Sequence, residues 1–436
     1  MEKCQKRLWS DTAEMPRFKE LHGDAETDVL IIGGGAAGLL CGYFLKKMGV
    51  DYIILEGDRI LSGVTGATTA KITTQHGLVY SRLVKEMGYD KARLYFEANR
   101  RALDTYREMS RIYPCDFTEA ASFVYLKEGE QRLVQEAETV RRLGFPAEKV
   151  NVNELPFKVA GAVRFPNQAQ FNPVKFFSQI AKDLNIYEKT FVREMSENQV
   201  TTGSGTVRAR KIIVASHFPI LNKHGCYYLK MYQSRSYVIA LQNAQILEGM
   251  YVDGEENGFS FRNYGDLLLL GGGGHKTGKK GGNWQALRDF AQKHYPESAE
   301  KYHWATQDCM TLDSVPYIGK YSKSTEGLYV AAGFNKWGMT SSMAAAQLLS
   351  NIVMGTGNKY EDVFDPSRSI IRPQLFVNMG EAVVNLIGFS KRRCPHLGCR
   401  LKWNKAENTW DCPCHGSRFS EDGLLLDNPS TGNIDI

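Results

Sequence analysis

Short apolar runs separated by an amphipathic segment mark the start of the chain as a β-α-β unit. Asp28–Ile32 is predicted to be a short buried strand, followed by glycines and then by a helical pattern that ends at Lys46 or Lys47. Tyr52–Leu55 is a second apolar run, and Glu56 follows it directly. Two buried strands joined by a helix in so short a span indicate the parallel sheet of an α/β domain.

The pattern then changes to long helices, to strands, and back to a strand–loop–helix unit. Ser81–Tyr113 carries apolar residues at roughly helical spacing among charges, and Gln131–Leu143 is predicted to be another helix. From Val163 to about Gly273 strands predominate. The clearest later elements are the strands Val207–Ala215, Tyr237–Leu241, Leu267–Leu270 and Leu328–Ala332, and a helix over Ala344–Met354 after a glycine loop.

Composition and charge place the chain among globular proteins of two or three domains. Of its 436 residues, 43% are hydrophobic and 23% are charged, which excludes a disordered or fibrous protein. The formal net charge of +6 is too small to indicate nucleic acid or a membrane by itself. We therefore expect no nucleic-acid partner.

The N-terminal region predicts neither secretion nor a membrane span. Met1–Thr27 has no apolar core of a signal peptide, and five glycines interrupt the apolar run Val29–Leu45. The sequence predicts a cytoplasmic protein without a transmembrane segment.

Gly33, Gly35 and Gly38 fit the pattern G-x-G-x-x-G between the first strand and its helix. The first two glycines allow a pyrophosphate to approach the backbone, the third allows close helix packing, and the helix N-terminus attracts phosphate. Glu56 lies 18 residues beyond Gly38, where a carboxylate accepts hydrogen bonds from ribose hydroxyls. A glycine turn in an unrelated α/β domain is the alternative, but strand, helix and acid together favour a dinucleotide.

Three separated motifs resemble those of the D-amino-acid oxidase (DAO) superfamily, in the same order along the chain. They are the glycine loop with Glu56, the segment Gly63–Lys71, and the late block Val315–Gly319 with Gly327–Thr340. The resemblance spans about residues 28–360 and implies bound FAD. The residues that it assigns to FAD are Gly33, Gly34, Gly35, Ala36, Ala37, Gly38, Glu56, Thr68, Thr69, Ala70, Lys71, Val192, Gly333, Gly338, Met339 and Thr340.

The late glycine loop and residue Ala67 predict how the flavin is stabilised and whether it is covalently attached. A helix that begins near the flavin pyrimidine ring would stabilise the negative charge of the reduced form. Some relatives attach FAD through a histidine near the position of Ala67, so we expect non-covalent FAD here. His76, nearby, is interpreted as an ordinary surface histidine.

A cysteine–histidine pattern near the C-terminus predicts a metal cluster. Cys394 and His396 form C-x-H, fifteen residues intervene, and Cys412 and His415 form C-x-x-H. Two loops that each offer one thiolate and one imidazole suit a Rieske [2Fe-2S] cluster. A Cys₂His₂ zinc site is the alternative, but zinc spacing normally opens with C-x₂₋₄-C and closes with H-x₃₋₅-H.

The cluster region also resembles the Rieske proteins of cytochrome bc complexes. That resemblance implies a disulfide between Cys399 and Cys414, and a Ser417 hydroxyl that bonds a cluster sulfur. Phe419 stands where high-potential members have tyrosine, which predicts a potential below that of the respiratory proteins. Lys391, Arg392 and Arg393 beside the first loop would suit an acidic electron partner, although a solvated face is the commoner meaning of such a run.

Together these features predict an α/β fold with three parts. They are a Rossmann-like FAD-binding domain of the glutathione-reductase type, an interleaved antiparallel-β substrate domain, and a small all-β C-terminal Rieske domain. The predicted ranges are an N-terminal extension (1–27), the oxidoreductase (28–365), a linker (366–373) and a short Rieske domain (374–436) whose base is truncated or completed by the flavoprotein. Within the oxidoreductase, FAD binding falls to 28–115, 190–225 and 310–360, and the substrate domain to 116–189 and 226–309.

A flavin takes two electrons and a Rieske centre passes one, which predicts how the two cofactors work together. We expect oxidation of an amine or amino-acid-like C–N bond by hydride transfer to FAD, with single electrons relayed through the cluster to an external acceptor. The alternatives are flow in the reductive direction, or electron transfer without a small substrate. A thiol switch at Cys399 and Cys414 is a third, less favoured interpretation.

Three residues are candidates for the catalytic site. Relatives that act on amino acids hold the substrate carboxylate with an arginine at the start of an R-P-x-T-x-D segment, and Asp308 stands there instead. This reversal of charge favours an amine, with Arg262 as the residue that would otherwise meet a carboxylate. Lys71 would hold a water near the reactive flavin nitrogen, or pair with an acid or an FAD phosphate.

Overall fold

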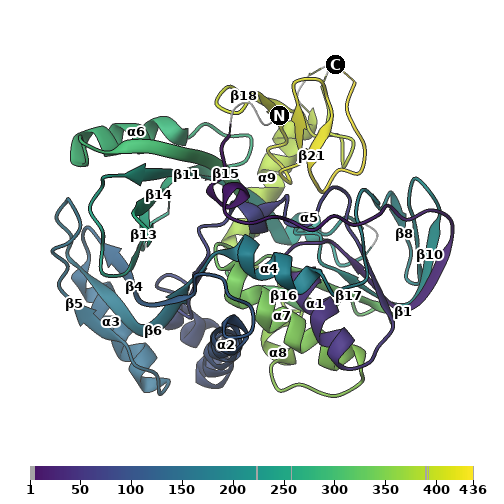
Figure 1. The fold of residues 1–436 in the computed structure, drawn as a ribbon, viewed down its shortest axis with the longest axis horizontal. Helices are drawn as coiled ribbons and strands as arrows, with labels where there is room; N and C mark the ends of the chain where they lie inside the picture. The colour runs from purple at the N-terminus through teal and green to yellow at the C-terminus, as the bar shows by residue number, and fades with distance from the viewer. Residues whose placement is uncertain (1–4, 222–223, 257, 388–389, 391, 436) are drawn as a thin grey trace.

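The computed structural model describes residues 5–221, 224–256, 258–387, 390 and 392–435, and arranges them around three sheets (Figure 1). The eight-stranded sheet has the order β16-β17-β10-β1-β2-β7, with β9 on β10 and β8 on β9. Its strands are β1 (Ala25–Ile32), β2 (Tyr52–Leu55), β7 (Ile186–Tyr187), β8 (Glu194–Met195), β9 (Gln199–Thr201), β10 (Thr206–Val214), β16 (Tyr317–Lys320) and β17 (Leu328–Ala332). β1 is central, pairs in parallel with β2 and β10, and buries Val29–Ile32.

Helices cover this sheet as the apolar spacing predicts. α1 (Ala36–Lys47) packs against α7 (Gly338–Val353), and α7 also packs against the long α2 (Tyr80–Ser110). α2 is kinked at Gly88, whose φ of 82° is left-handed. α7 begins six residues before the predicted start at Ala344, because the end of the glycine loop already forms the first helical turns. α4 (Pro173–Ala181) and α8 (Glu361–Phe364) complete this part.

The nine-stranded sheet is the predicted interleaved β domain. Its order is β15-β11-β14-β13-β12-β4-β6-β3, with β5 on β6, and all pairs except β12–β4 are antiparallel. The strands are β3 (Lys71–Ile72), β4 (Thr118–Leu126), β5 (Glu148–Val150), β6 (Gly161–Gln170), β11 (Met231–Gln242), β12 (Met250–Asp253), β13 (Ser260–Tyr264), β14 (Leu267–Lys276) and β15 (Ala299–Thr311). α6 (Asn283–His294) packs on β14 and β11, and α3 (Glu130–Arg142) packs on β6 and β5.

The C-terminal part is a small sheet preceded by a helix. Its order is β18-β19-β20-β21, with bounds Lys402–Asn404, Thr409–Asp411, Arg418–Ser420 and Leu425–Asp427. The sequence predicts segment 374–436 to be all β, and its first part is instead helical. It belongs to helix α9 (Pro373–Ile387), because its apolar residues are spaced for a helix. In the predicted linker, Arg368 is anchored by a bidentate ion pair with Asp313 (Nε–Oδ2, 2.7 Å; Nη2–Oδ1, 2.9 Å). Among the described residues, no helix is both long and apolar enough to span a bilayer.

A buried ion network joins the small sheet to the nine-stranded sheet. Glu407 Oε1 accepts hydrogen bonds from Arg235 Nε on β11 (3.1 Å) and from the Tyr237 hydroxyl (2.9 Å). Glu407 Oε2 accepts from Arg418 Nη2 on β20 (2.8 Å), and Arg418 Nε also reaches Asp411 (3.0 Å). Burial alone would raise the pKa of Glu407, but Arg235 and Arg418 hold it at about 2. The carboxylate is therefore charged and bound from both domains at once.

Replacing Glu407 by glutamine should destabilise the holoprotein by about 3–5 kcal/mol, because two buried arginines lose their shared counter-ion. The contribution of the native charge is complete above the unfolded pKa of about 4.3. It declines as the pH falls toward the folded value of about 2. Urea unfolding of Glu407→Gln and of Glu421→Gln, an exposed carboxylate of the same domain, measures the difference. Equal losses in the two variants would contradict the role given to the network.

Candidate active site and iron–sulfur centre

The glycine turn after β1 is sterically closed to any side chain at two positions. Gly33 has a φ of 116°, and a Cβ there would lie 2.5 Å from the carbonyl oxygen of Ala215 at the end of β10. A Cβ on Gly38 would lie 1.9 Å from the carbonyl oxygen of Gly33. The turn therefore brings β1, α1 and β10 together at backbone contact distance, as a dinucleotide site requires.

Glu56 closes the turn from the end of β2. Its Oε2 accepts from the Gly34 N–H (2.7 Å) and its Oε1 accepts from the Asp58 N–H (2.9 Å). Burial raises the pKa of this carboxyl despite the two N–H groups. The predicted ribose acceptor thus lies against the glycine turn.

The predicted flavin loop, Thr68–Lys71, is held from outside by residues far away in sequence. Trp9 of the N-terminal extension donates its indole N–H to the Thr68 carbonyl (2.7 Å). Arg262 donates to the carbonyl oxygens of Thr69 and Ala70, the latter at 2.9 Å. Because its guanidinium is buried and turned to the backbone, Arg262 braces this loop and is not placed to meet a substrate carboxylate.

His76 differs from its interpretation as a surface residue. It is buried, and its Nδ1 is bonded to the Tyr95 hydroxyl (2.7 Å). Its Nε2 is bonded to the Thr340 hydroxyl (3.0 Å), in the first turn of α7. The ring stacks on Trp337 with centroids 5.2 Å apart. His76 therefore fixes the start of the helix that the resemblance places under the flavin, a contact between distant segments that no local pattern signals.

One large cavity, of about 1690 Å³, connects these elements. The predicted residues that line it are Gly33, Gly35, Ala36, Ala37, Glu56, Thr68, Thr69, Lys71, Val192, Gly338, Met339 and Asp308. The cavity lining does not include the other predicted FAD residues, Gly34, Gly38, Ala70, Gly333 and Thr340. The cavity continues to Leu425–Asn428 of the C-terminal sheet, whereas the predicted cluster ligands Cys394, His396, Cys412 and His415 are not among its lining residues.

Two charged candidates face this cavity. Lys71 is bonded to the Thr69 hydroxyl (3.2 Å), and burial, with repulsion from Arg262, lowers its pKa to about 7. Asp308 on β15 pairs with Lys336 (Oδ2–Nζ, 3.0 Å) and accepts from the Ser236 hydroxyl (3.2 Å). Its charge is therefore balanced within the chain. Sequence analysis did not single out Arg82, an exposed cation that also lines the cavity.

The two cysteine–histidine loops share one backbone design. The Gly398 N–H donates to the Cys394 carbonyl (2.9 Å), and the Gly416 N–H donates to the Cys412 carbonyl (3.0 Å). Each of these glycines has a positive φ, 78° and 83°, which closes its loop. The loops therefore present their side chains toward each other.

The donor set fits a Rieske cluster. The imidazole rings of His396 and His415 lie with centroids 4.9 Å apart, and burial lowers the pKa of His415 to about 3, which keeps this ring neutral. Nδ1 of His415 is buried and accepts or donates no hydrogen bond within the described part of the chain. The Cys394 and Cys412 thiols are hydrogen bonded to each other, which lowers the pKa of Cys394. Two adjacent thiols and two neutral imidazoles are the ligands of a [2Fe-2S] centre of this type.

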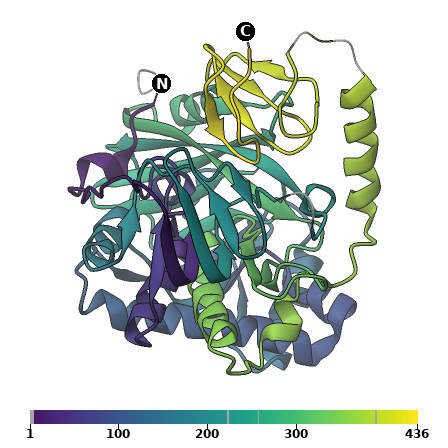
Figure 2. The same ribbon diagram turned by 90° about the vertical axis from the view of Figure 1, so that its right-hand side faces the viewer.

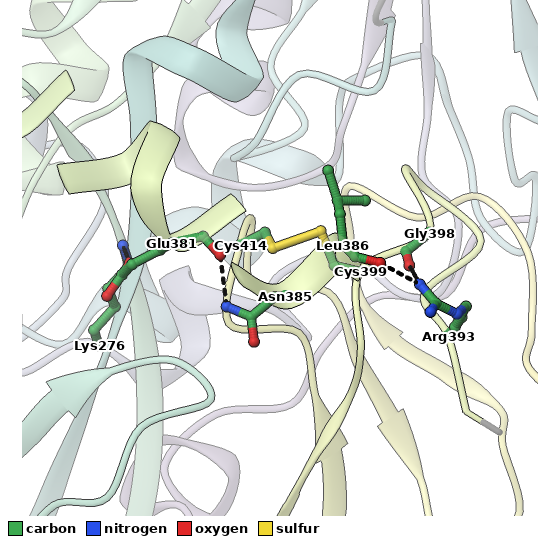
Figure 3. Close-up of a disulfide and its surroundings, with 8 residues drawn as sticks. All are labelled: Lys276, Glu381, Asn385, Leu386, Arg393, Gly398, Cys399 and Cys414. Carbon is green, nitrogen blue, oxygen red and sulfur yellow. Dashed lines mark hydrogen bonds and ion pairs between the residues drawn. A yellow bond between two sulfur atoms is a disulfide. The ribbon is translucent and has the colours of Figure 1, made fainter. Parts of the chain in front are cut away.

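Cys399 and Cys414 form the predicted disulfide between the two loops, with Cα atoms 6.7 Å apart (Figure 3). The sulfurs of Cys399, Cys412 and Cys414 all lie within 4.8 Å of one another. Two side chains of the nine-stranded sheet are hydrogen bonded to the second loop. Gln233 donates to the His415 carbonyl (2.8 Å), and Gln307 donates to the Gly416 carbonyl (2.9 Å).

Comparison with known proteins gives two family matches. The model of FAD dependent oxidoreductases (DAO) matches residues 28–352, and that of the Rieske [2Fe-2S] domain matches residues 379–436. The Rieske 2Fe-2S iron-sulfur protein YhfW of Bacillus subtilis is 32% identical over 97% of this chain and 95% of its own length. Gamma-glutamylputrescine oxidoreductase of Escherichia coli is 22% identical over 79% of this chain and 87% of its own.

Solved structures share the fold of the larger part. Glycine oxidase from Geobacillus kaustophilus has a TM-score of 0.67 at 20% identity and covers 79% of this chain and 100% of its own. L-proline dehydrogenase from P. horikoshii has a TM-score of 0.65 at 18% identity and covers 80% and 98%. The fold that the motifs predicted is thereby confirmed.

Replacing Gly33 by alanine should remove most of the flavin, because the new Cβ meets the Ala215 carbonyl where the backbone must stay close to a pyrophosphate. We expect the flavin-to-protein absorbance ratio to fall by at least about tenfold, equivalent to about 1.4 kcal/mol. Gly357→Ala is the matched control, since a Cβ there meets nothing within 4 Å. Full flavin content in Gly33→Ala would exclude this turn as the cofactor site.

Proposed function

The chain belongs to the FAD-dependent oxidoreductase (DAO) family and ends in a Rieske [2Fe-2S] domain, and from this we propose that it oxidises an amine or amino-acid-like C–N bond and passes the electrons singly to an external acceptor. It is an oxidoreductase that binds FAD and one Rieske cluster. Bound FAD takes a hydride, and the cluster carries one electron at a time.

The shared cavity is the observation that carries the electron relay. Its walls include the glycine turn and flavin loop at one end, and Leu425–Asn428 of the Rieske domain at the other. Asn428 donates to the carbonyl oxygens of Ser216 (2.6 Å) and Phe218 (2.9 Å), just beyond β10. Gln233 and Gln307 hold the cluster loop on the sheet that forms the cavity wall. This arrangement supports transfer between two cofactors whose domains are held against each other by hydrogen bonds.

The residues at the cavity support a substrate that carries an amine. Lys71 Nζ, with a pKa of about 7, is able to accept a proton from a substrate ammonium near neutral pH. Asp308 is already paired with Lys336, so it does not by itself select an ammonium over an amino acid. Arg82 supplies a cation for a carboxylate, and the named activities of glycine oxidase and gamma-glutamylputrescine oxidoreductase support this substrate class.

The proposal is tested by anaerobic mixing of the holoprotein with a panel of primary amines, secondary amines and amino acids. A substrate of this class should bleach the flavin absorbance without any added acceptor. If no member reduces the flavin while dithionite does, the proposed substrate class is wrong.

Replacing Cys412 by serine should separate the two halves of the reaction. The variant should lose the cluster but still show flavin bleaching by the substrate, because Cys412 lies in the small C-terminal sheet region and not at the glycine turn. Steady-state reduction of a one-electron acceptor such as ferricyanide should fall by at least about tenfold. Cys226→Ser, at an exposed cysteine, is the control. Unchanged steady-state reduction of the acceptor by Cys412→Ser would contradict the proposed electron relay through the cluster.

Replacing Lys71 by methionine should remove a pH-dependent step. In the native protein Lys71 is neutral above about pH 7, so the rate of flavin reduction should rise through that value. Lys71→Met should be slower by about 10²–10⁴-fold and should lack this rise. Stopped-flow absorbance across the pH range checks both, with the exposed Lys320→Met as control. A pH profile that keeps its step in Lys71→Met assigns the proton to another group.

A further inference from the structure

Helix α9 is built with its polar side turned toward the protein. Gln374, Asn378, Glu381 and Asn385 recur at helical spacing along one face. On that face Glu381 pairs with Lys276 and with Lys279 (Oε1–Nζ, 3.0 Å), and Asn378 accepts from Lys276 (3.2 Å). Asn378 and Asn385 are both buried. An ordinary surface helix has the opposite polarity, with its apolar face inward.

The outward face of α9 is apolar. Phe376, Val384 and Ile387 are 65%, 67% and 75% exposed. The neighbours that share this exposure are Val377, Met379, Val383 and Leu386. Figure 2 shows α9 along the edge of the molecule, beside the Rieske domain. A contiguous exposed apolar surface of this kind marks a contact with another body. The short helix α5 (Tyr227–Lys230) contacts α9, but these apolar side chains stay exposed.

Positive charge is concentrated around α9 and in the segment that follows it. From Ala382 to Ala406 the sequence has six lysines and arginines and no acidic residue. Lys279 pairs with Glu381 of α9, and Arg393 donates to the Leu386 carbonyl at the end of the helix, so both cations lie beside α9. Lys391, part of the basic run noted in the sequence, lies outside the described residues. Outside residues 366–405, basic and acidic residues are nearly equal in number, so this segment carries the excess charge of the chain.

We propose that α9 binds in the surface of an anionic membrane, with its apolar face in the boundary between headgroups and acyl chains. An apolar helix face flanked by lysines and arginines is the arrangement that binds there, since lipid takes the apolar side chains and anionic headgroups take the cations. A second copy of the chain is disfavoured, because pairing two α9 helices would bring two basic segments together.

Docking at α9 would also fix the position of the first cluster loop. Arg393 donates from Nη1 to the Leu386 carbonyl at the end of α9 (3.0 Å) and to the Gly398 carbonyl in that loop (2.8 Å), as Figure 3 shows. The Arg400 N–H donates to the Asn385 carbonyl (3.0 Å). The cluster would therefore deliver its electrons at the membrane surface. This consequence rests on the proposed function, whereas the binding itself does not.

The test is co-sedimentation of the holoprotein with vesicles of equal parts phosphatidylglycerol and phosphatidylcholine, and with phosphatidylcholine alone. We expect binding to the anionic vesicles, little binding to the neutral ones, and weaker binding as salt is raised. The double variant Val384→Asn, Ile387→Asn should bind at least about tenfold more weakly, because two apolar side chains no longer enter the lipid. The control pair Ile112→Asn, Ile246→Asn changes two other exposed apolar residues, 65% and 55% exposed, and should bind like the native protein.

Several outcomes would overturn the proposal. They are no sedimentation with anionic vesicles, equal binding to both kinds of vesicle, or equal binding by the double variant and the native protein. A dimer in size-exclusion chromatography that the double variant abolishes would assign the face to a second copy instead. Matching thermal midpoints and flavin spectra exclude misfolding as the cause of any loss. Sedimentation with vesicles needs no turnover, so its result does not depend on the outcome of the amine screen.

Discussion

The carboxylate of Glu407, buried between Arg235 of the large sheet and Arg418 of the small one, is the interaction on which the rest of the structure depends. It gives the Rieske domain one orientation, because a buried charge shared by two domains is costly to expose or to leave unpaired. That orientation lets Gln233 and Gln307 reach the second cluster loop. It also places Leu425–Asn428 in the wall of the cavity that begins at the glycine turn.

The active-site region is likewise held in place by residues that are distant in sequence. The flavin loop Thr68–Lys71 has little regular structure of its own, and its carbonyl groups are satisfied by Trp9 and Arg262. Such bracing leaves the side chains of the loop free to face the cavity. It also keeps a guanidinium close to Lys71, whose lowered pKa follows from burial and from this neighbour. One arginine thus shapes the loop and tunes the amine beside it.

The sequence predicted the motifs whose residues are neighbours in the chain, but not the contacts between residues far apart in the chain. The turn at Gly33 and the two cysteine–histidine loops are short motifs whose backbone demands appear in the residues themselves. Arg262 donates to carbonyl groups more than 190 residues away, and the bond from His76 to Thr340 spans 264 residues, so neither spacing nor residue type could predict these contacts. α9 was missed for a different reason. Its polar and apolar faces can be recognised in the sequence. Which face meets the protein depends on Lys276, at the end of β14, and on Lys279 in the turn that follows.

The sulfur atoms of the C-terminal loops lie close enough for more than one disulfide to form. Three of them, from Cys399, Cys412 and Cys414, lie within 4.8 Å of one another, so an oxidant acting on the metal-free chain has more than one pair within reach. A bond that captured Cys412 would consume a cluster ligand. Iron that reaches Cys394 and Cys412 first leaves Cys399 and Cys414 as the only pair of these four still able to join. A bound cluster of the predicted kind would therefore protect Cys412 from oxidation and leave the disulfide to Cys399 and Cys414.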